Sequence, residues 1–467
     1  MEKQHMLEEI YVPAIERKDA EIAISICDEE PPWVIPNCKK PKILTLIDSS
    51  VASITLELYP ELLKNSFVVG FDCKEENKSV EYLKKFKSDR KEELKQIDAL
   101  VIIGGGATLN FGTALAKDLY LKLLTFHFIL IPTTVLAMAD VAYGSQGLLN
   151  KKDEEGNLKR NAKRENYDPD RIILDKRYIN KLSPSLIKQG LAECLKHALL
   201  QETTGPDDFP KVDECIRLLR KINFNNDDNK DIISCVIKTI HAKIAVIKAQ
   251  NDKIEGAEHL LSYGHVDAEP RESASNFALA HGDAVLLSLA IELKLAGLTD
   301  ALEKVCSVLS AALYEAVCFD KETMRNHYTL SSKERFRVPK TNQENNSGEI
   351  KDINDTYYVI HLPQIGHFAS IQPVKMDEYS FQTLYEASQD ILALLKQSAP
   401  NLNKASADLS LENSLQNIKA SSSTSTPVFY NYNLTGTTET EPETKLQPEK
   451  TVSLTSSIKK ASPSGSQ

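Results

Sequence analysis

The sequence predicts an α/β protein with a Rossmann-like open parallel sheet in its N-terminal half and an all-helical domain in its C-terminal half. Between residues 41 and 182, short apolar runs of strand length alternate with helical patterns, which is typical of a parallel sheet covered by helices. From residue 183 onward, apolar residues recur at helical spacing instead. A carboxylate and two histidines embedded in this helical half form a candidate metal site.

Composition and charge exclude several classes of protein. The 467 residues carry a formal net charge of -10, which argues against non-specific nucleic-acid binding and against a charge-driven role at a membrane surface. No apolar run reaches the length of a membrane span, and the first residues lack a signal-peptide core. The eight cysteines include no Cys-x-x-Cys pair, which indicates reduced thiols. We therefore expect a cytoplasmic protein with neither nucleic acid nor a membrane as partner.

Four segments divide the chain. Residues 1–40 are charged and then irregular, and we expect a peripheral arm with at most one strand. Residues 41–182 form the expected nucleotide-binding α/β domain, and residues 183–398 form the helical domain. Residues 399–467 are rich in Ser, Thr, Asn and Pro without apolar periodicity, which predicts a disordered tail.

The apolar pattern also places individual elements. In the first half it predicts strands at 42–48, 66–71, 97–103 and 128–131, and helices at 75–90 and 110–121. In the second half it predicts helices at 184–200, 231–250 and 282–298, a late strand at 357–363 and a terminal helix at 381–396. Ser183 followed by Pro184 is a typical start for the first of these helices.

Two turns of the first half have residues suited to a nucleotide. Gly104-Gly105-Gly106 lies between a strand and a helix, where glycines admit a pyrophosphate and the helix N-terminus favours an anion. Leu109 stands where the Rossmann fingerprint has its third glycine, so a purely structural tight turn explains the run about as well. Thr133 and Thr134, with Asp140 downstream, would offer hydroxyls and a carboxylate to a ribose or polyol, although such residues are also common in turns.

The candidate metal ligands are Glu193, His265 and His281. Two histidines and a carboxylate leave coordination positions open for substrate oxygens, which suits catalytic Zn²⁺ and also admits Co²⁺ or Fe²⁺. Lys196 is one helical turn from Glu193 and shares its face. His197 and His259 compete as ligands, and we expect these two, with His241, to be packing or surface residues.

The order of these motifs resembles that of 3-dehydroquinate synthase and its relatives, the sugar phosphate cyclases, over roughly residues 40–370. Asp48-Ser49-Ser50-Val51 is similar to the family's Asp-x-Asn-Val nucleotide turn, and Glu75-Glu76-Asn77-Lys78 to its Glu-x-x-Lys. The glycine run with Asn110 resembles its Gly-Gly-Gly-x-x-x-Asp, with Asn as in 2-deoxy-scyllo-inosose synthases. The Pro-Thr-Thr…Asp140 spacing, Gly190…Lys196 and the sixteen-residue separation of His265 and His281, with Glu272 seven after the first, also match.

The resemblance implies a dehydroquinate synthase-like fold, NAD, a divalent metal (Zn or Co), a sugar phosphate substrate and a homodimer. The implied metal ligands are Glu193, His265 and His281. The implied NAD-binding residues are Asp48, Ser50, Glu75, Lys78, Gly105, Gly106, Ala107, Asn110, Thr133, Thr134 and Asp140. The implied catalytic residues are Lys196, Asp140, Asn161, Arg160 and Glu269. In such enzymes NAD oxidises a hydroxyl, phosphate is eliminated, the ketone is reduced again and an aldol reaction closes a carbocycle.

The sequence departs from the family pattern where cations would bind phosphate. A family lysine falls on Gln146, two arginines fall on Leu124 and Glu258, and a histidine falls on Glu269. Replacing a cation by a neutral or acidic group removes a charge-assisted contact. Lys243 or Lys248 would supply one missing cation. The departures argue against 3-dehydroquinate as the product.

Three functions are compatible with this pattern. The first is a cyclase acting on another sugar phosphate, such as a heptulose or hexose phosphate. The second is an NAD- and metal-dependent polyol or alcohol dehydrogenase, and the third is a non-catalytic relative with a binding role. A cyclase releases phosphate without net NADH, a dehydrogenase accumulates NADH, and a binding protein does neither.

Overall fold

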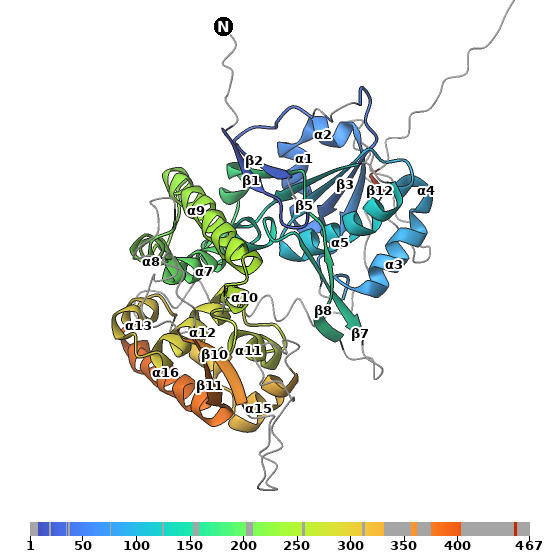
Figure 1. Cartoon of the computed structure of the whole chain (residues 1–467). Coiled ribbons are helices and arrows are strands. Elements are labelled where there is room, and N and C mark those ends of the chain that lie inside the picture. Colours follow the sequence, from blue (N-terminus) through green and yellow to red (C-terminus); the bar gives the residue numbers. More distant parts are fainter. Residues whose placement is uncertain are drawn as a thin grey trace, which may run out of the picture. The chain divides into compact units, whose positions relative to one another are not determined.

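The structure, a computed structural model, describes residues 8–17, 20–33, 35, 38–74, 76–123, 126–152, 158–201, 209–254, 257–310, 313–330, 356–361, 375–402 and 453–454. The chain forms two compact units (Figure 1). Unit 1 comprises Met1–Thr133, Ser145–Arg177 and Thr424–Gln467, and unit 2 comprises Thr134–Gly144 and Tyr178–Ser423. The predicted α/β class, with an open sheet followed by a helical part, is confirmed.

Unit 1 is built on an eight-stranded sheet with the order β1-β2-β9-β6-β5-β3-β4-β12. Its strands are β1 (Glu8–Pro13), β2 (Glu21–Cys27), β3 (Ile43–Asp48), β4 (Ser66–Phe71), β5 (Ala99–Gly104), β6 (His127–Pro132), β9 (Arg171–Asp175) and β12 (Ser453–Leu454). The six strands from β2 to β4 pair in parallel, and the edge strands β1 and β12 pair antiparallel. The strands β3 and β5 are buried along their whole length, which explains their continuous apolar sequence.

Helices connect these strands, as parallel pairing requires. They are η1 (Ser49–Val51), α1 (Ala52–Leu58), α2 (Pro60–Lys64), α3 (Val80–Asp89), α4 (Lys91–Leu94) and α5 (Gly106–Leu123). A separate antiparallel hairpin of β7 (Gln146–Lys152) and β8 (Leu158–Asn166) packs against α5. The close approach depends on Gly147, because a Cβ there would lie 2.6 Å from the main-chain N of Ala114 in α5.

Unit 2 is mainly helical. It contains the π-helical turn η2 (Ala137–Val141) and α7 (Pro184–Gln201), α8 (Val212–Leu219), α9 (Asn226–Asn251), α10 (Ala257–Leu260), α11 (Ala268–Ala274), α12 (His281–Leu295), α13 (Thr299–Cys306), α14 (Leu313–Val317), α15 (Lys321–Leu330) and α16 (Phe381–Leu402). An antiparallel pair, β10 (Thr356–His361) with β11 (Lys375–Ser380), accompanies them. The short α6 (Lys176–Ile179) contains a boundary between the units.

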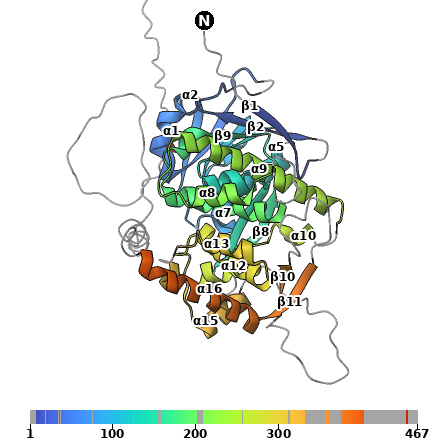
Figure 2. The same cartoon turned by 90° about the vertical axis from the view of Figure 1, so that its left-hand side faces the viewer.

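Helix α7 is central to unit 2, because it contacts α8, α9 and α12 (Figure 2). Its start is as predicted: Ser183 Oγ accepts the N–H of Leu186, and Pro184 occupies the first helical position. Its face toward α12 is buried, so Glu193 is carried into the interior of the unit.

The N-terminal region contributes more regular structure than expected. Two strands, β1 and β2, come from residues 1–40, and β2 pairs with β9 in register from Ala23–Arg171 to Cys27–Asp175. The predicted disordered tail lies largely outside the described residues, and the four-segment division stays a prediction. Within the described ranges, no helix is both long and apolar enough to cross a membrane.

Candidate functional site

Three predicted nucleotide motifs of unit 1 lie at one edge of its sheet. The strands β3, β5 and β6 are adjacent and parallel, so their carboxyl ends meet there. These ends carry the Asp48 turn, the glycine run and Pro132-Thr133. In open α/β sheets, ligands bind at the carboxyl ends of the strands.

The Asp48 side chain ties two of these motifs together. One carboxylate oxygen accepts from Ser50 N at 2.9 Å and from Ser50 Oγ at 2.7 Å, and the other accepts from Thr108 Oγ1 in α5 at 3.1 Å. A Cβ at Gly104 would lie 2.9 Å from the Cβ of Asp48, so only glycine fits. The turn therefore brings the N-terminus of the 18-residue helix α5 against the end of β3.

The predicted threonines have different environments. Thr133 donates its N–H to the carbonyl of Gly104 at 3.0 Å, and its buried Oγ1 has no hydrogen-bond partner within the described ranges. Thr134 Oγ1 instead accepts the N–H of Ala137 at 3.1 Å and opens the helical turn η2. The Thr133 hydroxyl is thus a buried group that a nucleotide at this edge would satisfy.

Lys78 and Asn161, distant in sequence, are brought together in unit 1. Lys78 Nζ donates to Asn161 Oδ1 at 3.1 Å, and Asn161, at φ 52°, donates its N–H to Asn150 Oδ1 at 2.9 Å. The fully buried Asn150 also donates its N–H to the carbonyl of Lys78 at 2.7 Å. Asn150 was not predicted, because a single asparagine within a strand gives no sequence signal.

The other predicted residues of unit 1 lie in α5, in the hairpin or outside the described residues. Asn110 links α5 to the hairpin, since its Oδ1 accepts the N–H of Leu148 at 2.9 Å. Gly105 precedes α5, and Gly106 and Ala107 form its first turn. Gln146 begins β7. Glu75 and Leu124 lie outside the described residues, as does the side chain of Arg160.

In unit 2, Asp140 lies in the π-helical turn and pairs with a cation on α9. Lys243 Nζ donates to Asp140 Oδ1 at 2.7 Å and to its carbonyl oxygen at 2.6 Å. Burial opposes ionisation of this carboxyl, but Lys243 outweighs burial and holds the pKa of Asp140 well below its usual range. The sequence offered Lys243 and Lys248 as candidates for a missing cation, and Lys243 is the one that pairs with Asp140.

Gly190 lets α7 approach the segment that carries Asp140. A Cβ on Gly190 would lie 2.4 Å from the main-chain N of Leu136 and 2.4 Å from the carbonyl carbon of Val135. Only glycine permits this approach. The same helix carries Glu193 less than one turn later, so Asp140 and Glu193 influence each other electrostatically.

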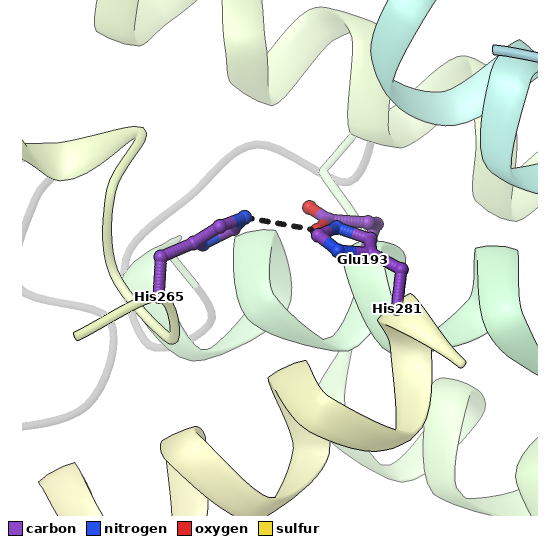
Figure 3. Close-up of side chains that lie close together, drawn as sticks. All are labelled: Glu193, His265 and His281. Carbon is purple, nitrogen blue, oxygen red and sulfur yellow. Dashed lines mark hydrogen bonds and ion pairs between the residues drawn. The ribbon is translucent and has the colours of Figure 1, made fainter. Parts of the chain in front are cut away.

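The three predicted metal ligands converge (Figure 3). Glu193 Oε1 lies 3.2 Å from His281 Nε2 and 3.7 Å from His265 Nε2. One ligand atom of each residue lies within 4.8 Å of the others. This donor set of two imidazole nitrogens and one carboxylate oxygen suits a catalytic Zn²⁺ or Co²⁺ with open positions.

Hydrogen bonds orient both imidazole rings. The Nδ1 of His265 lies 3.0 Å from the carbonyl of Tyr263, so this nitrogen is the donor and Nε2 carries the lone pair that a metal would accept. His281 Nδ1 lies 3.0 Å from Glu272 Oε1. Burial alone would lower the pKa of His281, but the Glu272 and Glu193 carboxylates outweigh it and raise that pKa to about 10.

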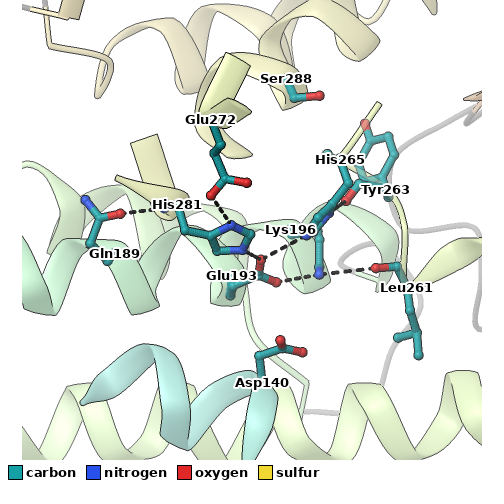
Figure 4. A network of polar contacts seen from close by, with 12 residues as sticks. Asp140, Gln189, Glu193, Lys196, Leu261, Tyr263, His265, Glu272, His281 and Ser288 are labelled. Atoms are coloured by element: carbon teal, nitrogen blue, oxygen red, sulfur yellow. Dashed lines mark hydrogen bonds and ion pairs between the residues drawn. The ribbon is translucent and has the colours of Figure 1, made fainter. Parts of the chain in front are cut away.

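Two residues that support His281 were not predicted as functional (Figure 4). Glu272 on α11 completes a carboxylate–histidine pair of the kind that orients metal-bound imidazoles. Gln189 on α7 accepts the N–H of Gly282 and donates to Asp283 at 3.1 Å, which fixes the start of α12 beside its first residue, His281. Gln189 precedes Glu193 by four residues, so helical spacing was an available signal.

Charged groups next to the triad complete the site. Lys196 forms a buried ion pair with Glu193 Oε2, and its Nζ also lies 3.4 Å from the carbonyl of Leu261. Burial disfavours the Glu193 carboxylate, but Lys196 and both triad histidines hold its pKa well below the usual range. Glu269 lies half-buried one turn before Glu272 on α11. The side chain of Glu258 lies outside the described residues.

His197, the competing ligand, is not part of the triad. It is fully buried on α7, and neither ring nitrogen has a hydrogen-bond partner within the described ranges. Burial lowers its pKa to about 3, so it is neutral at ordinary pH.

Two family models match consecutive stretches of the chain. The 3-dehydroquinate synthase N-terminal model matches residues 68–189, and the C-terminal model matches residues 190–333. Together they cover more than half of the sequence. The chain belongs to the 3-dehydroquinate synthase family.

Curated 3-dehydroquinate synthases align with parts of the chain. The enzyme of Sulfurisphaera tokodaii is 29% identical over 199 residues, which are 43% of this chain and 52% of that protein. The enzyme of Campylobacter concisus is 26% identical over 306 residues, 61% of this chain and 82% of that protein. The chain thus spans about half the length of the first of these 3-dehydroquinate synthases.

Solved structures of related cyclases share the fold. A 2-deoxy-scyllo-inosose synthase complexed with carbaglucose-6-phosphate, NAD+ and Co2+ has a TM-score of 0.60 at 18% identity, covering 83% of this chain and 100% of that chain. The 2-epi-5-epi-valiolone synthase of Streptomyces hygroscopicus subsp. jinggangensis, with NAD+ and Zn2+ bound, has a TM-score of 0.57 at 18% identity, covering 82% and 99%. The predicted superfamily is confirmed.

Proposed function

We propose that this protein is an NAD- and divalent-metal-dependent sugar phosphate cyclase that oxidises its substrate, eliminates phosphate and closes a carbocycle. The observation that carries the proposal is the convergence of His265 Nε2 and His281 Nε2 on Glu193 Oε1 in a member of the 3-dehydroquinate synthase family. The chemistry of these donors fits Zn²⁺ or Co²⁺. The buried Thr133 hydroxyl and the glycine turn before α5 fit a dinucleotide.

When bound, the metal would polarise substrate hydroxyls as a Lewis acid, and NAD would exchange hydride with the substrate. The protein's own residues bind and orient. Glu193, His265 and His281 would hold the metal, while Asp48, Lys78, Gly105 and Thr133 would contribute to NAD binding. Lys196 Nζ and the Asp140 carboxylate, which pairs with Lys243, place a charged donor and an acceptor beside Glu193, where they would bind substrate oxygens.

We propose a substrate other than the one that yields 3-dehydroquinate. Glu269 occupies the position where the family resemblance implies a histidine. A carboxylate accepts hydrogen bonds from a hydroxyl and repels a phosphate oxygen. A heptulose or hexose phosphate whose hydroxyl reaches Glu269 fits this change. By the same resemblance we propose a homodimer, which light scattering on the purified chain would test.

The test is a panel of sugar phosphates with inorganic phosphate as the readout. The full-length protein, supplied with NAD and Zn²⁺ or Co²⁺, is expected to release phosphate from at least one heptulose or hexose phosphate, and His265→Ala is expected to abolish release. A protein that accumulates NADH from a polyol instead would be a dehydrogenase. A protein that retains neither metal nor NAD would refute both enzymatic functions.

A further inference from the structure

The segment that carries His265 is held by a buried carboxyl that has no role in the proposed chemistry. This segment, residues 261–267, is named here the His265 loop, and it contains no helix or strand. Glu292 on α12 is 1% exposed and accepts the N–H of Gly264 at 3.0 Å. The main-chain N–H of Val266 also favours the charged form of this carboxyl. The two main-chain donors lie on either side of His265.

Ser288, one turn earlier on α12, extends this contact. Its hydroxyl donates to Glu292 Oε1 at 3.2 Å and accepts the N–H of Asp267 at 3.1 Å. The Asp267 carboxylate in turn accepts from Tyr328 OH at 2.6 Å and pairs with the fully buried Arg271. The main-chain N–H groups of Gly264 and Asp267 are therefore satisfied by two side chains of one helix.

The backbone of the loop is fitted to the same helix. Gly264 has a φ of 74°, and a Cβ there would lie 2.9 Å from Leu289 Cδ2 of α12. Val266 is buried in a core cluster with Met324, Tyr328, Val359, Phe381 and Leu384. The loop is thus held on both sides of His265 by hydrogen bonds to α12, and Val266 adds hydrophobic packing.

This backbone geometry decides where His265 points. Its ring is oriented by the Nδ1 hydrogen bond to the Tyr263 carbonyl, two residues back, so a shift of the main chain at 263–266 would turn Nε2 away from Glu193. Helix α12 also begins with the other imidazole, His281. Helix α12 therefore carries one imidazole of the triad directly and positions the other through the loop.

We propose that Glu292 and Ser288 are positioning residues of the metal centre, which hold the main chain on both sides of His265 so that its Nε2 faces Glu193. The inference rests on the proposed metal-dependent function and deepens it. An alternative, that Glu292 only satisfies buried donors, predicts no effect on metal binding beyond a general loss of stability.

The chemistry of Glu292 suggests a conservative replacement. Burial is the main cause that raises the pKa of this carboxyl to about 8, while the N–H and O–H groups of Gly264, Ser288 and Val266 that face it oppose the rise. A neutral acceptor is therefore adequate at this position. Glutamine retains the carbonyl oxygen and the size of the neutral acid, whereas alanine leaves the main-chain donors without a partner.

The test measures Co²⁺ binding to the full-length chain by competition with a chromophoric chelator, together with the visible spectrum of bound Co²⁺. Glu292→Ala is expected to bind Co²⁺ about 10- to 100-fold more weakly and to alter the spectrum, because outer-shell partners have effects of this size. Ser288→Ala is expected to weaken binding less, and Glu292→Gln to remain within about threefold of wild type. Leu293→Ala, a buried change at the next residue of α12, controls for lost stability and should leave the spectrum unchanged.

Three results would overturn the inference: wild-type affinity in Glu292→Ala, equal losses in Glu292→Gln and Glu292→Ala, or a matching loss in Leu293→Ala. If the wild-type chain binds no Co²⁺, the proposed function fails together with the inference. If wild type binds Co²⁺ and Glu292→Ala binds it equally well, the inference fails alone.

Discussion

Removing the carboxylate of Glu272 should weaken metal binding although all three ligand residues are kept. Glu272 lies 3.0 Å from His281 Nδ1, and its side chain is 8% exposed. A hydrogen bond to a charged group contributes about 1.5–3 kcal/mol, and loss of such outer-shell partners lowers metal affinity about 10- to 100-fold. Each tenfold loss of affinity corresponds to about 1.4 kcal/mol. The free energy of the hydrogen bond and the expected loss of metal affinity therefore both lie at about 2 kcal/mol.

Two variants separate the charge of Glu272 from its hydrogen bond. Glu272→Gln keeps an amide oxygen that can accept from Nδ1, so we expect about a tenfold loss of Zn²⁺ affinity, whereas Glu272→Leu should lose close to 100-fold. Competition titration with a chelator measures both. Glu303→Gln on α13 removes the same charge from an exposed position and serves as the control. Affinity within twofold of wild type in Glu272→Leu would refute the assignment of Glu272 as the residue that orients His281.

The remaining predictions concern packing, pH and metal removal. Gly190→Ala should destabilise the protein by about 1–3 kcal/mol in chemical denaturation, because its Cβ would overlap the main chain at Val135 and Leu136; unchanged stability would contradict the close approach. His197 has a folded-state pKa of about 3, below its unfolded value, so only the unfolded state gains a proton between about pH 6.5 and 3. Stability should therefore fall with decreasing pH in that window by up to about 1.4 kcal/mol per unit, and His197→Leu should flatten the profile measured by urea unfolding; an equally steep profile in the variant would assign the slope to other groups. Chelation should abolish phosphate release and lower the melting temperature, and Zn²⁺ at about 100 times its Kd should restore about 2.7 kcal/mol of stability; calorimetry that shows no shift would argue against binding to the folded state.

Several features could be predicted from sequence because they depend on local patterns. The apolar run at 66–71 is strand β4 at the same bounds, since its residues are apolar on both faces of a parallel sheet. Glu193, His265 and His281 lie close together, as the donor chemistry and the family resemblance led us to expect, and their role as metal ligands stays a prediction. Helix α7 begins where Ser183 and Pro184 indicate.

Other features depend on polar residues whose role is visible only in the fold. Helix α9 begins at Asn226, earlier than the predicted residue 231, because Asn225 and Asp228 form a capping box within a polar stretch. Helix α3 begins at Val80 and not at 75, since Ser79 caps it by accepting the N–H of Tyr82.

Contacts between residues far apart in the chain also could not be predicted from the sequence. The ion pair of Lys243 with Asp140 joins residues 103 positions apart, and the Glu292 contact with Gly264 joins residues 28 positions apart. A charged residue on a helix usually faces solvent, so no local pattern distinguishes these buried partners.

The ratio of phosphate released to NAD supplied tests the proposed reaction most directly. The full-length protein is given a limiting amount of NAD, excess Zn²⁺ or Co²⁺ and a substrate from the sugar phosphate panel, while phosphate and NADH are followed together. Because a cyclase returns the hydride within each cycle, phosphate should exceed the NAD present many times over, with no accumulation of NADH. Phosphate release that stops at one equivalent of NAD, or NADH that rises in step with turnover, would contradict the proposed cyclase.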